Sequence, residues 1–100
     1  MMIEELLNKE ITNEEVFFSV LQSLIYEINC KNIEQIDNDQ DIFSTIKDIR
    51  EIFAEKIIPD FIHCYFRNLK TDQIYLLEVE SYHGVGGVLQ SISTPTKTNM

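Results

Sequence analysis

The sequence predicts an α+β fold, in which two amphipathic helices and a short N-terminal helix come before a three-stranded antiparallel β-meander that packs on the helices. In the first 57 residues, apolar side chains recur at every third or fourth position, as they do on one face of a helix. From residue 60 onward the apolar period is two, and β-branched and aromatic residues are frequent, as in strands. The apolar stripes of the two longer helices can cover one face of the sheet.

The most regular helical pattern runs over residues 13–30, where apolar residues recur at spacings of one and three. Thr12 and Glu15 have the spacing of a capping box, in which the hydroxyl accepts from a free backbone N–H and the carboxylate reaches back. Upstream, residues 2–9 place apolar residues at helical spacing and predict the short first helix. The stripe of the long helix consists of Val16, Phe17, Val20, Leu21, Leu24, Ile25 and Ile28.

A polar and acidic stretch, residues 31–40, is expected to be a loop that leads into a second long helix over residues 41–57. Asp39 or Asp41 is the expected N-cap, since a carboxylate there accepts from the free N–H groups of the first turn. Pro59 ends the helix, because the residue before a proline disfavours helical backbone. The apolar stripe consists of Ile42, Phe43, Ile46, Ile49, Ile52, Phe53 and Ile57.

Residues 61–68 and 73–81 predict two antiparallel strands joined around residues 69–72. A short even-numbered loop gives a register in which the numbers of paired residues sum to 141. One face of this hairpin is then apolar throughout and belongs to the core, with the pairs Ile62–Val79, Cys64–Leu77 and Phe66–Tyr75. The other face, which we term the open face, is apolar at its centre and charged at its ends, with the pairs Phe61–Glu80, His63–Glu78, Tyr65–Leu76 and Arg67–Ile74.

The third strand is expected over residues 88–93, after a glycine-containing loop at residues 83–87. A phosphate-binding loop needs a helix after its glycines, so a hairpin loop is the better interpretation, and His83 at its tip is a candidate contact residue. Residues 1–93 are therefore interpreted as a single domain. The C-terminal tail, residues 94–100, is expected to be disordered.

The bulk composition narrows the function. The net charge is −9, and the eight Lys and Arg residues are scattered, so no cationic track for nucleic acid is expected. The sequence shows neither a long apolar run nor a basic and then apolar leader, which predicts a cytoplasmic protein without membrane attachment. Cys30 and Cys64 lack metal-binding spacing and are expected to be buried thiols. Isoleucine outnumbers leucine by 15 to 8, which is typical of an AT-rich bacterial or phage genome.

The acidic segment from Asp37 to Asp48 partly imitates a calcium-binding loop, since Asp37, Asp39 and Asp41 alternate as the first oxygen ligands of such a loop do. The imitation fails at Ile42, where a calcium loop needs glycine for its sharp turn. No metal or other cofactor is therefore expected. The remaining interpretations are a solvated loop with a helix cap and an acidic patch for a basic partner.

His63 and Glu78 face each other on the open face. A carboxylate could orient the imidazole as a general base, but such a pair is also a common cross-strand contact worth roughly 0.2–1 kcal/mol. No serine or cysteine nucleophile shares this face, because Cys64 points to the core. We therefore expect no enzyme, and a small enzymatic or ligand-binding pocket near His63 and Glu78 is the alternative interpretation.

The apolar centre of the open face predicts a binding surface, because monomers rarely leave such a patch uncovered. Its cover could be residues 1–7, a second copy of the chain in a homodimer, or another protein. With the acidity, this favours a small acidic inhibitor, of the immunity-protein, antitoxin or anti-defence type, that blocks a basic protein partner. A homo-oligomeric adaptor subunit is a further alternative. The expected partner-binding residues are Asp37, Asp39, Asp41, Phe61, His63, Tyr65, Leu76, Glu78 and Glu80.

Overall fold

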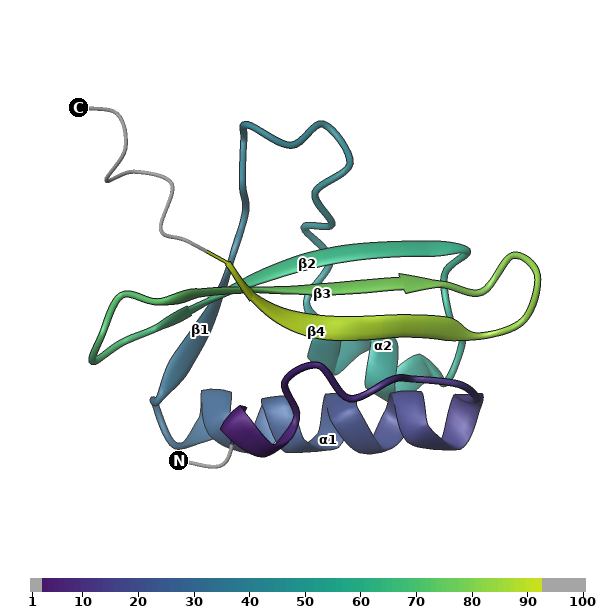
Figure 1. Cartoon of the computed structure of the whole chain (residues 1–100), viewed down its shortest axis with the longest axis horizontal. Coiled ribbons are helices and arrows are strands. Elements are labelled where there is room, and N and C mark those ends of the chain that lie inside the picture. The colour runs from purple at the N-terminus through teal and green to yellow at the C-terminus, as the bar shows by residue number, and fades with distance from the viewer. Residues whose placement is uncertain (1–2, 93–100) are drawn as a thin grey trace.

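The computed structural model describes residues 3–92, which form a sheet with the helices packed beneath one of its faces (Figure 1). The four strands make one antiparallel sheet in the order β1-β2-β3-β4. The predicted α+β class and the meander of the last three strands are confirmed, and β1 is an additional strand. In chain order the elements are the 3-10 helix η1 (Ile3–Glu5), α1 (Glu14–Asn29), β1 (Ile33–Ile36), α2 (Ile49–Glu55), β2 (Phe61–Asn68), β3 (Ile74–Glu80) and β4 (Gly86–Ile92).

Helix α1 follows the range predicted from its apolar stripe, but its cap differs from the prediction. The side chain of Asn13, and not that of Thr12, accepts a hydrogen bond of 2.9 Å from the backbone N–H of Val16. Asn13 has extended backbone and so presents its amide oxygen to the first turn, as N-cap residues do. The side of α1 that faces the core buries Phe17, Val20, Leu21, Leu24 and Glu27.

The register of the β2–β3 hairpin is the predicted one, from the pair Phe61–Glu80 to the pair Arg67–Ile74. The face assigned to the core is buried throughout and contributes Ile62, Cys64, Phe66, Tyr75, Leu77 and Val79 to the hydrophobic cluster beneath the sheet. The next strand begins after a hairpin loop, so the glycine-containing stretch is not followed by a helix, as expected. A side chain at Gly87 would overlap the carbonyl oxygen of Glu78, which explains the glycine there.

The predicted loop at residues 31–40 contains strand β1, which the sequence analysis missed. Lys31 takes a left-handed backbone conformation (φ 62°) and turns the chain sharply after α1. Ile33 is then buried in the core, and the strand pairs with β2 from Ile33–Asn68 to Ile36–Tyr65. Four residues with two isoleucines are too few to show a clear strand period, and pairing with β2 determines the structure.

The second helix is much shorter than predicted, since α2 starts at Ile49 and not at residue 41. Its N-cap is Asp48, whose carboxylate accepts from the backbone N–H of Arg50 at 2.8 Å, so the expected cap at Asp39 or Asp41 is wrong. Residues 37–48 form a loop, which we term the acidic loop. The helix ends at Glu55, because its C-cap Lys56 takes a left-handed backbone conformation (φ 58°) before Pro59 is reached.

The N-terminal segment lies against the edge of β4 and does not cover the open face. Backbone hydrogen bonds join Asn8 to Leu89 at 2.8 Å and Ile11 to Gly87 at 2.8 and 3.0 Å. The predicted helix over residues 2–9 is reduced to the single turn η1, whose Ile3 is fully buried in the core. The proposed cover by residues 1–7 is therefore wrong for residues 3–7. The predicted tail, residues 94–100, lies outside the described residues.

Candidate functional site

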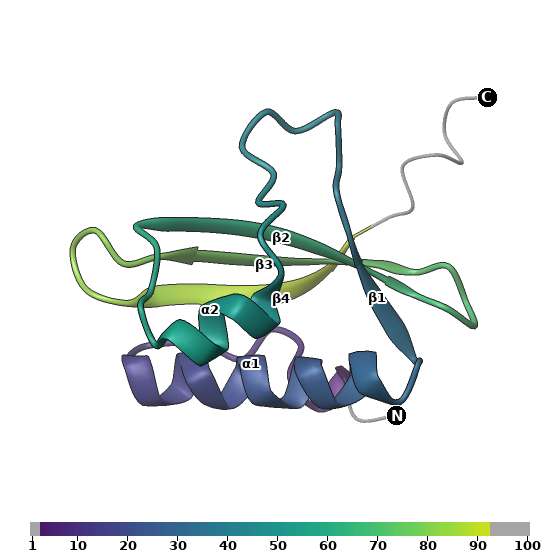
Figure 2. The same ribbon diagram turned by 180° about the vertical axis from the view of Figure 1, so that it is seen from behind.

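The acidic loop stands on the side of the sheet opposite to the helices, above the open face (Figures 1 and 2). Its conformation is maintained by its own hydrogen bonds, because the backbone N–H of Asn38 donates to the hydroxyl of Ser44 at 3.1 Å. Asp41 and Ser44 continue this arrangement, with backbone bonds from Asp41 to Asn38 and from Ser44 to Asp41. The loop is thus a compact Ω-type loop with neighbouring ends.

Thr45 fastens the end of the acidic loop to the edge of β2. Its backbone N–H donates to the carbonyl oxygen of His63 at 2.7 Å, and its hydroxyl accepts from the backbone N–H of His63 at 2.9 Å. This pairing uses the part of the β2 edge that β1 does not reach, since β1 pairs with residues 65–68. The end of the loop therefore bonds to the sheet at Thr45, and this explains why no helix forms there.

The carboxylate of Asp41 turns from the loop down to the open face. It accepts from the hydroxyl of Tyr65 at 2.6 Å, from the backbone N–H of Phe43 at 2.9 Å, and lies 3.1 Å from Nδ1 of His63. These hydrogen bonds, that of Tyr65 foremost, lower the pKa of Asp41 to about 2. Burial, followed by the bond to Asp41, raises the pKa of Tyr65. Asp41 is thus ionised, and its hydrogen bonds fasten the loop to strand β2.

His63 lies between two carboxylates from different elements. Its Nδ1 is 3.1 Å from Oδ2 of Asp41, and its Nε2 is 3.1 Å from Oε2 of Glu78, the residue opposite it on β3. A neutral imidazole donates through one nitrogen only, so the protonated ring is the form that bonds both carboxylates. Neither nitrogen faces an open position, and this arrangement does not suit a general base, which needs a free nitrogen for its substrate.

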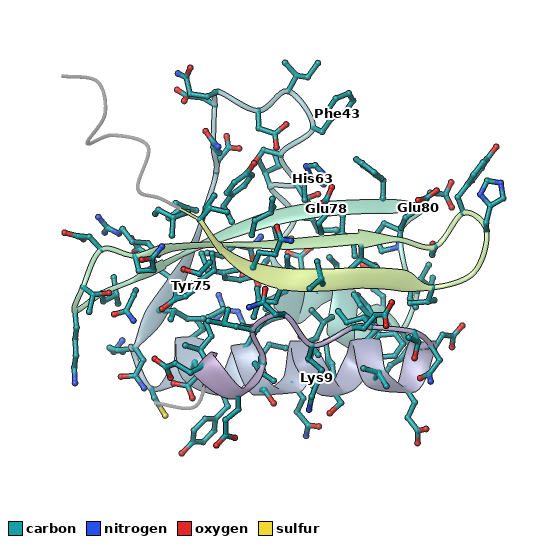
Figure 3. All side chains as sticks on the ribbon, viewed as in Figure 1. Lys9, Phe43, His63, Tyr75, Glu78 and Glu80 are labelled. Carbon is teal, nitrogen blue, oxygen red and sulfur yellow. The ribbon has the colours of Figure 1, made fainter. Side chains whose placement is uncertain are left out.

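An exposed aromatic and aliphatic group lies over this polar cluster. The Phe61 ring stacks on the His63 ring with centroids 4.7 Å apart, and Phe43 meets Phe61 edge-on at 6.0 Å. Figure 3 shows Phe43 in the acidic loop, above His63 and Glu78. Ile42, Phe43 and Phe61, which we term the apolar tip, are 89%, 60% and 46% exposed. A contiguous patch of exposed apolar side chains on a protein surface is typical of a site that binds another molecule.

The predicted partner-binding residues are only partly brought together. Asp41, His63, Tyr65 and Glu78 form the hydrogen-bonded cluster described above. Phe61 stacks on that cluster. Of the other four, Leu76 is half-buried opposite Tyr65 and Glu80 is opposite Phe61, whereas Asp37 and Asp39 are exposed in the acidic loop.

Sequence reasoning missed Ile42 and Phe43 because both fit the helical stripe that was assigned to the core. The available signal was their context, since they follow the polar run Asp-Asn-Asp-Gln-Asp and precede Ser44 and Thr45. Such residues bond to nearby backbone and favour turns over helix, and Asp41 does so here with Phe43. A helix would have had to compete with these local hydrogen bonds.

A metal site, a reactive cysteine and a pocket are the other features that could carry chemistry among the described residues. Within residues 3–92, no group of three or more His, Cys, Asp and Glu side chains is placed to hold a metal ion. Cys64 is buried, and burial raises its pKa to about 12, which favours the thiol over the nucleophilic thiolate at neutral pH. Cys30, expected to be buried, is exposed. A hollow of about 290 Å³ lies beside β1, and its lining includes Ile36, Ile46 and Arg50 but neither His63 nor Glu78.

Comparison with known proteins gives no match: no family model fits the chain, and no curated protein and no solved structure is significantly similar to it. None of the helices in residues 3–92 has the length and apolar character needed to span a bilayer.

Proposed function

We propose that the protein is a small acidic interaction module that binds and blocks a basic protein partner, as immunity proteins, antitoxins and anti-defence proteins do. The observation that carries this proposal is the apolar tip, which is exposed and in which Phe61 lies directly opposite Glu80. Tight protein inhibitors combine two such features, a few aromatic or aliphatic anchors and a charged rim that complements the partner.

The apolar tip supplies the anchors. Phe43 and Phe61 are large, and each loses one face or edge to the other, so a partner that covers them removes a contiguous apolar surface from water. The acidic loop that presents Phe43 is fastened at Thr45 and at Asp41 before any partner arrives. An anchor that is already ordered loses little conformational entropy on binding, which favours affinity.

The rim around the tip is acidic. Asp37 and Asp39 are exposed in the loop, and Glu78 and Glu80 lie on the open face, on strand β3. The basic residues of neighbouring elements are already paired, since Lys47 bonds to Glu55 at 2.7 Å and Arg67 bonds to Glu34 at 2.5 Å. With a net charge of −9, the chain attracts a cationic protein and repels a second copy of itself.

A pull-down from the native host extract at low and at moderate salt tests the proposal. The bait is compared with the variants Phe43→Ala and Tyr26→Ala, because Tyr26 is as exposed as Phe43 (62%) but lies on α1, beneath the sheet. We expect a stoichiometric basic protein that is captured by the native chain and by Tyr26→Ala but lost with Phe43→Ala. The purified partner should then lose its own activity when one equivalent of the native chain is added.

Three outcomes would contradict the proposal: no captured protein at either salt, capture that Phe43→Ala leaves unchanged, or a partner whose activity is not inhibited. Light scattering over a concentration series distinguishes the homo-oligomeric alternative from the binding of a different protein. A molar mass that doubles with concentration, and returns to that of a monomer in Phe43→Ala, would favour a homodimer through the open face. The alternative of a pocket near His63 and Glu78 predicts instead that a small ligand binds and that Phe43→Ala leaves its affinity unchanged.

A further inference from the structure

The ring of Phe61, at the end of the open face, is only partly covered by the rings of His63 and Phe43. His63 stacks against it with the two ring planes inclined by 27°, and Phe43 meets it edge-on with the planes at 80°. Nearly half of Phe61 remains exposed despite these two contacts. The exposed face of an aromatic ring carries the negative end of its quadrupole and attracts cations.

Two carboxylates border this ring. Glu80 lies directly opposite Phe61 on β3, and Glu78 lies opposite His63. Side chains in such cross-strand positions have Cβ atoms about 4.5–5.5 Å apart, so the carboxylate of Glu80 can reach a group that lies on the ring. Both side chains are about half exposed, and in the part of the chain from residue 3 to 92 their ion pairs are with histidines, His63 and His83, and not with Lys or Arg.

We infer that this end of the open face is a binding site for an arginine side chain, which lies flat on Phe61 and pairs with Glu80. A guanidinium is planar and weakly hydrated, so it stacks on an aromatic face while its N–H groups donate to a carboxylate at the ring edge. A lysine ammonium would be a weaker occupant, because it keeps its hydration and has no flat face. That the natural ligand is an arginine of the basic partner rests on the proposed function, whereas the binding of an arginine side chain at this site does not depend on it.

The test uses the full chain and N-acetyl-arginine amide as the probe, followed by NMR. N-acetyl-citrulline amide, which has the same shape without the charge, is the matched ligand control. We expect saturable shifts of the Phe61 ring signals and of the Glu80 amide with arginine, and none with citrulline. Phe61→Leu and Glu80→Gln should each weaken the affinity roughly two- to fivefold, as expected for an exposed cation–π or ion pair. Glu10→Gln, an exposed acid before α1, should change nothing.

The inference is overturned if no saturable shift occurs up to the solubility limit of the probe, if citrulline gives the same shifts, or if Glu80→Gln binds arginine as the native chain does. Failures of the two proposals are distinguishable. Arginine binding without a captured partner would leave the site standing and remove the proposed function. If a partner is captured in a Phe43-dependent way but the chain does not bind arginine, the proposed function stands and the arginine site is ruled out.

Discussion

The hydroxyl of Tyr65 donates a hydrogen bond of 2.6 Å to the carboxylate of Asp41, and so joins strand β2 to a loop residue that precedes it by 24 positions. Asp41 also bonds to the backbone N–H of Phe43, the aromatic residue that the loop presents to solvent. One carboxylate therefore links the sheet to the exposed anchor. The sequence leaves open whether this segment is a solvated loop with a helix cap or an acidic patch for a partner. In the structure, the hydrogen bonds of Asp41 position the loop.

Replacing Tyr65 with phenylalanine should loosen this link without emptying the space that the ring fills. We expect Tyr65→Phe to lower the free energy of unfolding by roughly 0.5–1.5 kcal/mol, because one hydrogen bond of a buried hydroxyl is lost. Amide exchange at Thr45 should become faster than in the native chain. Tyr26→Phe, at an exposed position of α1, is the control and should leave both quantities unchanged. Equal behaviour of the two variants would show that the Tyr65–Asp41 bond does not hold the loop.

The lowered pKa of Asp41 predicts a specific response to acid. In the folded chain the pKa is about 2, against 3.8 for an ordinary aspartate, because the hydroxyl of Tyr65, the His63 ring and the N–H of Phe43 favour the charged form. As pH falls, the unfolded chain takes up this proton first, so protonation favours unfolding. The contribution of Asp41 is fully present above about pH 4 and is lost as the pH falls toward about 2.

Urea unfolding at a series of pH values measures this contribution. The difference in unfolding free energy between the native chain and Asp41→Asn should shrink as the pH falls from about 4 to about 2. Asp39→Asn, at an exposed position of the same loop, serves as the control for removal of one negative charge. A native-minus-Asp41→Asn difference that stays constant through the acid range would contradict the assignment.

The cap of α1 provides a test of the corrected helix start. Asn13→Ala removes the side chain that accepts from Val16 and should cost about 1 kcal/mol, within the 0.5–2 kcal/mol typical of N-caps. Thr12→Ala should change the free energy of unfolding by less than about 0.5 kcal/mol, because Thr12 is exposed and is not the cap. Chemical denaturation of both variants measures the two losses in the free energy of unfolding. A larger loss for Thr12→Ala would restore the capping box with Glu15.

The two exposed aspartates of the acidic loop should act on association and not on folding. We expect Asp37→Asn with Asp39→Asn to leave stability unchanged within about 0.5 kcal/mol, since both side chains are exposed. The association rate with the basic partner should fall at low salt, and its dependence on salt should become shallower, because fewer charges steer the encounter. Stopped-flow measurement over a salt series gives both quantities. The matched control, Glu4→Gln with Glu10→Gln, removes two exposed charges elsewhere; an equal effect there would indicate net charge alone.

Local patterns in the sequence suffice for α1 and for the β2–β3 hairpin. In α1 the repeating apolar residues commit one face to the core, and in the hairpin a shift of one residue would expose Ile62 and Leu77 together. The pairing of His63 with Glu78 and of Phe61 with Glu80 follows from the same register, so part of the candidate site was predictable. Such arrangements depend on neighbours along one strand or one helix turn.

Only the tertiary structure decided the course of residues 33–48. Ile33 becomes a strand residue because β2 offers it a partner, and Ile42 and Phe43 leave the core because Thr45 and Asp41 bond to β2. In isolation the apolar stripe of residues 41–57 favours a helix. The free edge of a strand 18 residues later, with its unpaired backbone groups, competes for the same segment and stabilises the loop instead. Its sequence alone could not reveal that contact, and the exposed anchor of the candidate site depends on it.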